Sequence, residues 1–333
     1  MIRNHNYPLA IGLIISLFFI FIAVAGPSLA PLDPMVVFND PIFIGDEIYI
    51  PAALPVPPME LSQFVLGTDN VGRDLYSRLL NAIRPTLILC LVIAAVRIGL
   101  GVVLGLAAGW YKGFFERMIE TLMGASLAVP ILLFALAALS FMGERTLLTF
   151  MIALTLTGWA NTAVFVKNRT QTTMQAPYIE GARAVGVKPS GILRRYILPQ
   201  LWPALPALMA FELGSVLLLL AELGFLGMFI GDAFVQMAAD PNSPAMVAVG
   251  ITATFPELGQ MLSDFWSKMI RTPWEVAIVG TAVFLQIFAF NMLGEGLRRM
   301  MDITRPRRSW LQKRRQQLAL PMPPEGEKAS VPA

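Results

Sequence analysis

Six long apolar stretches dominate the hydrophobic pattern of this chain, and each is close to the length of a membrane-spanning helix. A helix needs roughly 20 mostly apolar residues to cross about 30 Å of hydrocarbon. The stretches that meet this condition are 9–30, 87–109, 119–142, 147–166, 203–230 and 275–296. The pattern therefore predicts an all-α integral membrane protein with six transmembrane helices.

The first apolar stretch admits two interpretations. Arg3 precedes the apolar run, and Ala23-Val24-Ala25 is similar to the small-residue site at which signal peptides are cleaved. The run from Leu9 to Ala25 is longer than the apolar region of a usual signal peptide. We expect residues 1–30 to form a retained N-terminal transmembrane helix, and cleavage is the alternative.

The distribution of Lys and Arg predicts the orientation in the membrane. With the N-terminus in the cytoplasm, the inside segments carry 18 of these residues and the outside segments carry 6. Cytoplasmic loops are enriched in Lys and Arg, so both termini are expected to be cytoplasmic. Residues 31–86 then form an external loop and 87–303 a transmembrane core. We expect residues 304–333 to form a basic, disordered tail near anionic lipid headgroups.

Composition narrows the classes of function. The 333 residues are 56% apolar and only 14% charged, and the mean hydropathy is +0.65. These values exclude an ordinary soluble enzyme and a nucleic-acid-binding domain. With one Cys and one His, and no Gly-x-x-x-x-Gly-Lys-Ser/Thr sequence, no catalytic residue, metal site or bound cofactor is expected.

The two longest external loops differ in character. The loop at 31–86 is rich in Pro at its start and has some strand character over 40–50. The loop at 231–274 contains an apolar stretch, 245–255, that is too short to span a membrane. Long loops of this kind are either functional or disordered.

The cytoplasmic segment at 176–195 has the pattern of a short helix held beside the membrane. Pro177 suits a first helical turn, and Glu180 lies near the positive end of the helix dipole. Gly186 suits a helix end. Ile179, Ala182 and Val185 share one face. Two interpretations stay open: the apolar face binds a groove on a partner, or the helix lies on the lipid surface.

Three short runs in this region resemble the Glu-Ala-Ala…Gly…Ile-Leu-Pro loop of ABC-importer permease subunits. They are Glu180-Gly181-Ala182, Gly186 and Ile197-Leu198-Pro199. In that family the loop is the coupling helix that docks on the ATPase subunit. Gly181 stands where the pattern has Ala, which costs roughly 1 kcal/mol of helix propensity.

Other runs place the chain near the peptide and nickel permeases, on the dipeptide "C" type subunit. The segment 66–74 resembles their Gly-Thr-Asp-x-x-Gly-Arg-Asp sequence, 221–227 resembles the end of their fifth span, and 289–302 resembles the end of their last span. The loop after the fifth span departs from the family pattern. It is enlarged, and Leu258 stands in the place of a Trp.

The resemblance implies the type I fold of ABC-importer permeases and a four-part assembly around this chain. The partners would be a homologous second permease subunit, two ABC ATPase subunits and an external substrate-binding protein. The complex would import peptides or similar small polar solutes across the cytoplasmic membrane of a prokaryote. The residues that would carry coupling are Glu180, Gly181, Ala182, Gly186, Leu198 and Pro199.

The residues alone leave other substrates and other classes of function open. Nickel chelates and sugars are alternative substrates. A secondary transporter or channel would also explain six spans with charges inside them. An intramembrane enzyme would need a catalytic constellation, for which one His and Cys90 leave little material.

Several polar residues interrupt the expected spans. A charge at the bilayer centre costs about 2.5–3.5 kcal/mol on insertion scales, so Arg97 and Glu212, at similar expected depth, are predicted to pair. Thr157 and Asn161 either bond neighbouring helices or line a polar path, and Glu222 is a candidate for the path or an external gate. Gly101, Gly105 and Gly109, four residues apart, are expected to let two helices pack closely or to form a sliding contact in gating.

Overall fold

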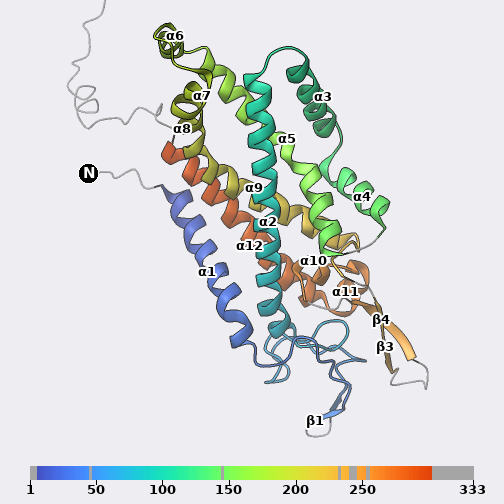
Figure 1. The fold of residues 1–333 in the computed structure, drawn as a ribbon. Coiled ribbons are helices and arrows are strands. Elements are labelled where there is room, and N and C mark those ends of the chain that lie inside the picture. The colour runs from blue at the N-terminus through green and yellow to red at the C-terminus, as the bar shows by residue number, and fades with distance from the viewer. Residues whose placement is uncertain are drawn as a thin grey trace, which may run out of the picture.

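The computed structural model describes residues 6–44, 47–143, 146–231, 234–239, 246–252 and 256–301. Five helices in these ranges are long and apolar enough to cross a membrane, or up to six if the bent pair described below counts as one span. The long helices run side by side (Figure 1). They are α1 (Tyr7–Leu29), α2 (Leu75–Trp110), α5 (Leu147–Met174), α9 (Leu205–Phe225), which continues a helical segment from Pro189, and α12 (Pro273–Met301).

The third expected span is a broken one. It consists of α3 (Phe114–Ala128) and α4 (Ile131–Met142), which meet at an angle of 95°. Pro130 stands in the break, and a residue that precedes a proline is disfavoured in the α conformation. Val129 is accordingly extended, with ψ of 130°. The prediction of one continuous helix over 119–142 missed this bend.

Helix α2 begins at Leu75, well before the expected start at 87. The Asp74 side chain accepts a 2.8 Å hydrogen bond from Ser77 N and caps the helix. Polar residues such as Arg78 made this first part look like loop, but Arg78 is buried against the segment that precedes the helix. The loop predicted over 31–86 therefore ends before Leu75.

Two small antiparallel hairpins lie at one end of the molecule, opposite α6 (Figure 1). Strands β1 (Ile42–Ile44) and β2 (Glu47–Tyr49) pair Ile42 with Tyr49. Strands β3 (Phe234–Ala239) and β4 (Met246–Thr252) pair Phe234 with Thr252. The apolar stretch at 245–255 thus contains a strand, in keeping with its β-branched residues. We call the end of the molecule that carries the two hairpins the hairpin end, and the opposite end the α6 end.

Glycines set the spacing between α2 and α5. A Cβ at Gly101 would lie 2.6 Å from Thr162 Cβ, one at Gly105 would lie 2.5 Å from the Ala163 carbonyl oxygen, and one at Gly109 would lie 2.7 Å from Thr170 Cβ. A side chain at any of these positions would force the helices apart. The stripe therefore acts as a packing surface, as expected.

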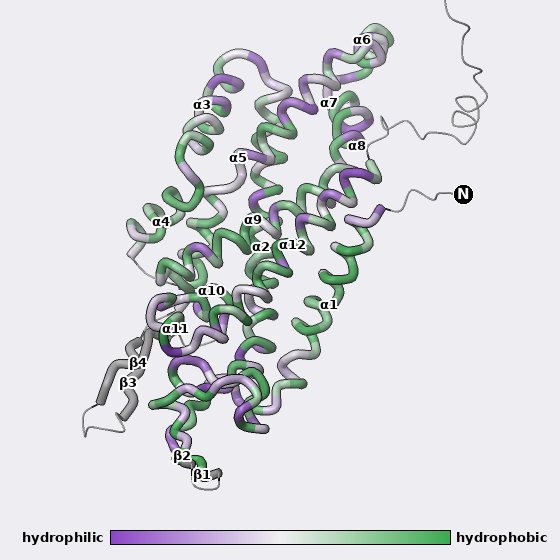
Figure 2. The backbone as a smooth tube through the Cα atoms, turned by 180° about the vertical axis from the view of Figure 1, so that it is seen from behind, coloured by the Kyte–Doolittle hydropathy of each residue, from purple (hydrophilic) through white to green (hydrophobic). Residues whose placement is uncertain are grey.

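The segment after α5 forms a chain of short helical pieces at the α6 end (Figure 1). They are α6 (Pro177–Ala184), α7 (Pro189–Ile192), the π-helix Leu193–Ile197, α8 (Leu198–Leu201) and the 3₁₀ turn Trp202–Ala204, which leads into α9. At the hairpin end, α10 (Leu258–Met261) and α11 (Phe265–Arg271) precede α12. Figure 2 shows hydrophobic residues along the long helices and many hydrophilic residues toward both ends.

Candidate functional site

Helix α6 ends in a capping motif that depends on glycine. Gly186 has φ of +81°, its N–H donates to the Arg183 carbonyl at 2.9 Å, and Val187 N–H donates to the Ala182 carbonyl at 3.0 Å. This is the Schellman arrangement, in which a residue of left-handed conformation closes the helix. Glu180 lies in the first turn and is exposed. The expected roles of Pro177 and Gly186 in starting and ending the helix agree with the structure.

The apolar face of α6 points into its own chain. Ile179 is fully buried and Ala182 is 6% exposed, and Ile179 packs with Ile192 and Ile197 of the following segment. Val185, predicted on the same face, is 80% exposed. The expectation that the face around Ala182 is open to a partner is therefore wrong. The side chains of Ile192 and Ile197, in the helical segment after α6, are apolar and are shielded from water by α6. This is why the apolar face of α6 turns inward.

The surface left open on α6 consists of other residues. They are Pro177, Tyr178, Glu180, Gly181, Arg183, Ala184, Val185 and Gly186. A Cβ at Gly181 would meet nothing within 4 Å, so the departure from the Ala of the family pattern does not serve packing within the chain. Leu198 and Pro199, also predicted for this site, are exposed on α8.

Four side chains that the sequence analysis did not single out fasten α6 to its neighbours. The Tyr178 ring stacks on Tyr196, with centroids 6.1 Å apart and planes at 22°. Gln200 Nε2 donates to Tyr178 Oη at 2.5 Å, and Thr173 Oγ1 donates to Gln200 Oε1 at 2.8 Å. We call Thr173, Tyr178, Tyr196 and Gln200 the clamp. It joins α6 to α5, to the π-helix and to α8.

Pro199 accounts for the π-helix between α7 and α8. A proline has no N–H to donate to the carbonyl four residues earlier, and its ring crowds that carbonyl. The chain widens before it, and Leu198 N–H donates to the Leu193 carbonyl, five residues back. Single π turns within helices are frequent at functional sites. The Ile-Leu-Pro run thus has a structural effect on the path from α6 to α9.

The structure brings Arg97 and Glu212 together in the middle of the helices. Arg97 Nη1 lies 3.4 Å from Glu212 Oε2, and Arg97 is fully buried. Arg97 also donates to the Leu154 carbonyl at 2.8 Å and to Thr157 Oγ1 at 2.9 Å. A Cβ at Gly158 would overlap the guanidinium, so this glycine makes room for it. Arg97 thereby joins α2, α5 and α9.

The residues predicted to line the translocation path differ in their exposure. Thr157 is buried and engaged with Arg97, and Thr162 Oγ1 donates to Glu212 Oε1 at 3.5 Å. Asn161 is exposed on α5, and Glu222 is half-buried on α9. Neither belongs to the Arg97 network, so only Asn161 and Glu222 have surface to offer a solute.

A second buried ionic network lies at the hairpin end, within the sequence that resembled the peptide and nickel permeases. Asp69 Oδ2 lies 2.7 Å from Arg73 Nε and 3.2 Å from Arg78 Nε. Burial alone would raise the pKa of Asp69, but the guanidinium groups of Arg73 and Arg78 outweigh it and lower the pKa. Arg78 Nη2 donates to Gln260 Oε1 at 2.8 Å, which ties this segment to α10.

Lys268 and Glu275 extend the ionic network toward α12. Their side chains are buried and lie 2.8 Å apart, and Lys268 Nζ also donates to the Met261 carbonyl at 2.7 Å. The backbone N–H of Asn70 donates to Glu275 Oε2 at 3.1 Å. In the sequence, Lys268 lies in an expected external loop and Glu275 begins the last expected span, and their spacing gives no sign that they meet.

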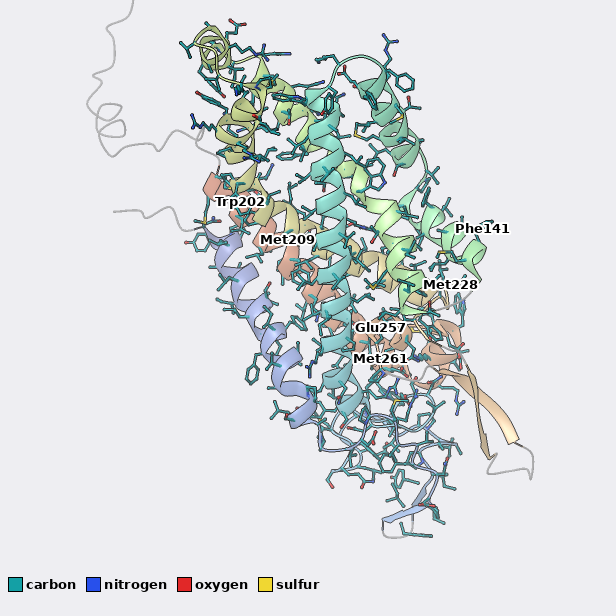
Figure 3. All side chains as sticks on the ribbon, in the orientation of Figure 1. Phe141, Trp202, Met209, Met228, Glu257 and Met261 are labelled. Carbon is teal, nitrogen blue, oxygen red and sulfur yellow. The ribbon has the colours of Figure 1, made fainter. Side chains whose placement is uncertain are left out.

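Glu257 is a buried carboxyl group at the start of α10, within the helices in Figure 3. Its oxygens accept from Gly259 N and Gln260 N, each at 3.3 Å. Burial raises the pKa of Glu257 to about 7. Within the described ranges, no group of three or more His, Cys, Asp or Glu residues is placed to hold a metal ion.

The long apolar helices define a multi-pass membrane protein. Residues 101–302 match the family of binding-protein-dependent transport system inner membrane components, and the chain belongs to this family. It is therefore the permease component of an ABC importer, in the inner membrane. Members of this family work in a transporter complex that includes an ATPase.

Relatives with assigned transport systems are similar over most of the chain. The glutathione transport system permease protein GsiD of Pectobacterium atrosepticum is 31% identical over 71% of each chain. The di/tripeptide transport system permease protein DppC of Pseudomonas aeruginosa is 28% identical over 90% of this chain and 88% of its own. A chain of the inward-facing MetNI methionine ABC transporter has 16% identity and a TM-score of 0.47, over 65% of this chain and 92% of that chain.

Proposed function

We propose that this chain imports peptides as one of two homologous permease subunits, together with two ABC ATPase subunits and an external substrate-binding protein. The support for a peptide is that relatives 28–31% identical carry the names of glutathione and di/tripeptide systems. Both termini lie in the cytoplasm in this proposal, as the excess of Lys and Arg in the inside segments favours. The α6 end then faces the ATPase subunits.

The open surface of α6 would receive the movement of an ATPase subunit. Glu180, Val185 and Gly186 are exposed on it, while Ile179 and Ala182 hold the helix to the chain. The clamp would pass the movement to α5 and, through the π-helix and α8, to α9. The observation that carries this proposal is that α6 is open on one side and fastened by stacking and hydrogen bonds on the other.

Within the helices, Arg97 and Glu212 would keep α9 in register with α2 and α5. Asn161 and Glu222 are the side chains on α5 and α9 that would meet the solute or form the external gate. Nickel chelates and sugars stay as alternative substrates, and binding measurements with the cognate substrate-binding protein distinguish them from peptides.

The coupling role is tested by Glu180→Arg in the assembled complex. We expect this variant to reach the membrane but to lose the ATPase subunits on purification and to lose ATP-driven uptake. Arg117→Glu, at an exposed position on α3, is the control for a charge change elsewhere and should retain both. Retention of the ATPase subunits and of uptake by Glu180→Arg would contradict the proposal.

The ATP-driven mechanism is tested separately in proteoliposomes. The complex is expected to take up solute only with ATP and the substrate-binding protein. Uptake by this chain alone, driven by an ion gradient, would support a secondary transporter instead.

A further inference from the structure

One side of the helical segment between α6 and α9 is open along its whole length. Its exposed residues change from basic to aromatic and apolar in the direction of α9. We call them the open stripe, and they are Arg194, Arg195, Leu198, Pro199, Trp202, Pro203 and Pro206. In a chain that crosses a membrane, this order is expected where a helix passes from water through the headgroups into hydrocarbon.

The two arginines of the open stripe carry uncompensated charge. In the described part of the chain, neither Arg194 nor Arg195 forms an ion pair, whereas Arg298 and Arg299 at the end of α12 both pair with Glu295. Glu180 is the one acidic residue between positions 167 and 201, against six Lys and Arg. The positive potential of this segment is therefore left for an outside anion.

Trp202 marks the level of the boundary between hydrocarbon and headgroups. It is 75% exposed, and in Figure 3 it lies between α6 and the long transmembrane helices. Exposed tryptophans gather at membrane interfaces, because the ring is apolar and its N–H prefers polar surroundings. At 1.5 Å per residue, Arg195 lies about 10 Å along the helix from Trp202 toward the α6 end, and its long side chain can reach back into the headgroup layer, which extends about 5–7 Å beyond the hydrocarbon.

We propose that the open stripe is a binding site for an anionic phospholipid. Arg194 and Arg195 hold the phosphate of the headgroup, Trp202 lies at the level of the ester groups, and the acyl chains follow Leu198, Pro203 and Pro206. Guanidinium groups bind phosphate through two parallel hydrogen bonds, so they suit this ligand. The bound lipid stabilises the π-helix side of the coupling path, and this role does not depend on the transported substrate.

The site is tested on the complete transporter in nanodiscs that contain mixtures of phosphatidylglycerol and phosphatidylcholine. Lipids retained after extraction are counted by native mass spectrometry. The wild-type complex is expected to retain phosphatidylglycerol preferentially. Because each cation near an anionic surface contributes about 1 kcal/mol, R194Q/R195Q should weaken this preference by about 30-fold. R194K/R195K keeps the charge but loses the two parallel hydrogen bonds of each guanidinium, so it should retain only part of the preference.

Two further variants separate the open stripe from charge in general. R298Q/R299Q removes the same number of positive charges, but from arginines that are already paired with Glu295. It should leave the preference for phosphatidylglycerol unchanged. Trp202→Ala should lower the retention of phosphatidylglycerol several-fold at unchanged charge. Both are measured in complexes whose subunit composition is first checked.

Three results would overturn the lipid site. The first is equal phosphatidylglycerol retention by the wild type and R194Q/R195Q. The second is loss of the ATPase subunits from R194Q/R195Q at unchanged lipid preference, which would show that the arginines bind protein. The third is an equal effect of R298Q/R299Q, which would reduce the finding to net charge. If R194Q/R195Q fails to assemble, the single variants R194Q and R195Q are measured instead, and phosphatidylglycerol retention equal to that of the wild type in both would likewise overturn it.

Discussion

The two ends of this permease use charge in opposite ways. At the hairpin end, Asp69, Arg78 and Lys268 are buried and each has an ionic partner. At the α6 end, Glu180 and Arg194 are exposed and form no ion pair with the described residues. Buried pairs hold segments in one arrangement, because separating them leaves an uncompensated charge. The comparison teaches that buried ion pairs fix the hairpin end, while α6 and the helical segment that follows it keep their exposed charges for other molecules.

The largest expected effect comes from opening the network at the hairpin end. Arg78→Ala leaves Asp69 with one cation and Gln260 without its donor, so the free energy of unfolding should fall by about 3–5 kcal/mol. Thermal melting of the purified complex measures this. Arg84→Ala, at an exposed position on the same helix, is the control and should change it by less than about 0.5 kcal/mol. An equal loss of stability in Arg78→Ala and Arg84→Ala would show that the buried network does not hold the hairpin end together.

The Arg97–Glu212 pair lies between the two ends and is tested by a double-mutant cycle. Arg97→Ala and Glu212→Ala should each lower the free energy of unfolding by about 3 kcal/mol, because each leaves a buried charge unpaired. The double variant should be less impaired than the sum of the two, by about 0.5–3 kcal/mol. Strict additivity in thermal melts would count against a functional pair.

Glu257 gives the hairpin end a pH dependence of its own. Burial raises its pKa to about 7, above the ordinary value, so ionisation of this carboxyl group disfavours the folded state. Stability should therefore fall as pH rises from about 4.5 to 7, by up to about 3 kcal/mol, and then level off. Asp69, with its lowered pKa, loses its contribution only at more acidic pH.

The pH dependence is measured by melting the wild-type and Glu257→Gln complexes at pH 5 and pH 8. The stability of the variant should fall less between pH 5 and pH 8 than that of the wild type, because residue 257 no longer ionises. The variant should also be more stable than the wild type at pH 8. Parallel slopes for the two proteins would show that Glu257 does not titrate in this range.

The smallest expected effect is at α6. Gly181→Ala should stabilise the helix by at most about 1 kcal/mol, because Gly181 has open space around it and Ala is the better helix former. Hydrogen exchange of α6 in the assembled complex should slow accordingly. A loss of ATPase binding in this variant would show that a partner fills the space at Gly181.

Much of the fold could be predicted from hydrophobic periodicity, because spans must be long and apolar. The glycine stripe of α2 and the pairing of Arg97 with Glu212 could also be anticipated. Membrane helices associate through close packing at small residues, and an unpaired charge inside the bilayer is costly. The bend at Pro130 was missed although a proline marks it. A proline in a membrane span is often tolerated, so its effect on direction depends on neighbours that the sequence does not place.

The early start of α2 and the inward face of α6 could not be predicted. In α2, Arg78 looked solvent-exposed because its partners, Asp69 and Gln260, come from distant loops. In α6, the pattern identified an apolar face but not which surface would cover it. Ile192 and Ile197 do so only because Pro199 and the π-helix shape the following segment. Tertiary contacts decided both cases.

In the proposed mechanism the open surface of α6 binds an ATPase subunit, and cysteine cross-linking tests this contact most directly. The native Cys90 is buried, so a new exposed cysteine is the reactive one. In the assembled complex, Val185→Cys is predicted to cross-link to an ATPase subunit, and Ala182→Cys, on the inward face, is predicted not to do so. Free maleimide labelling of Val185→Cys in the intact complex, without any cross-link, would contradict the claim.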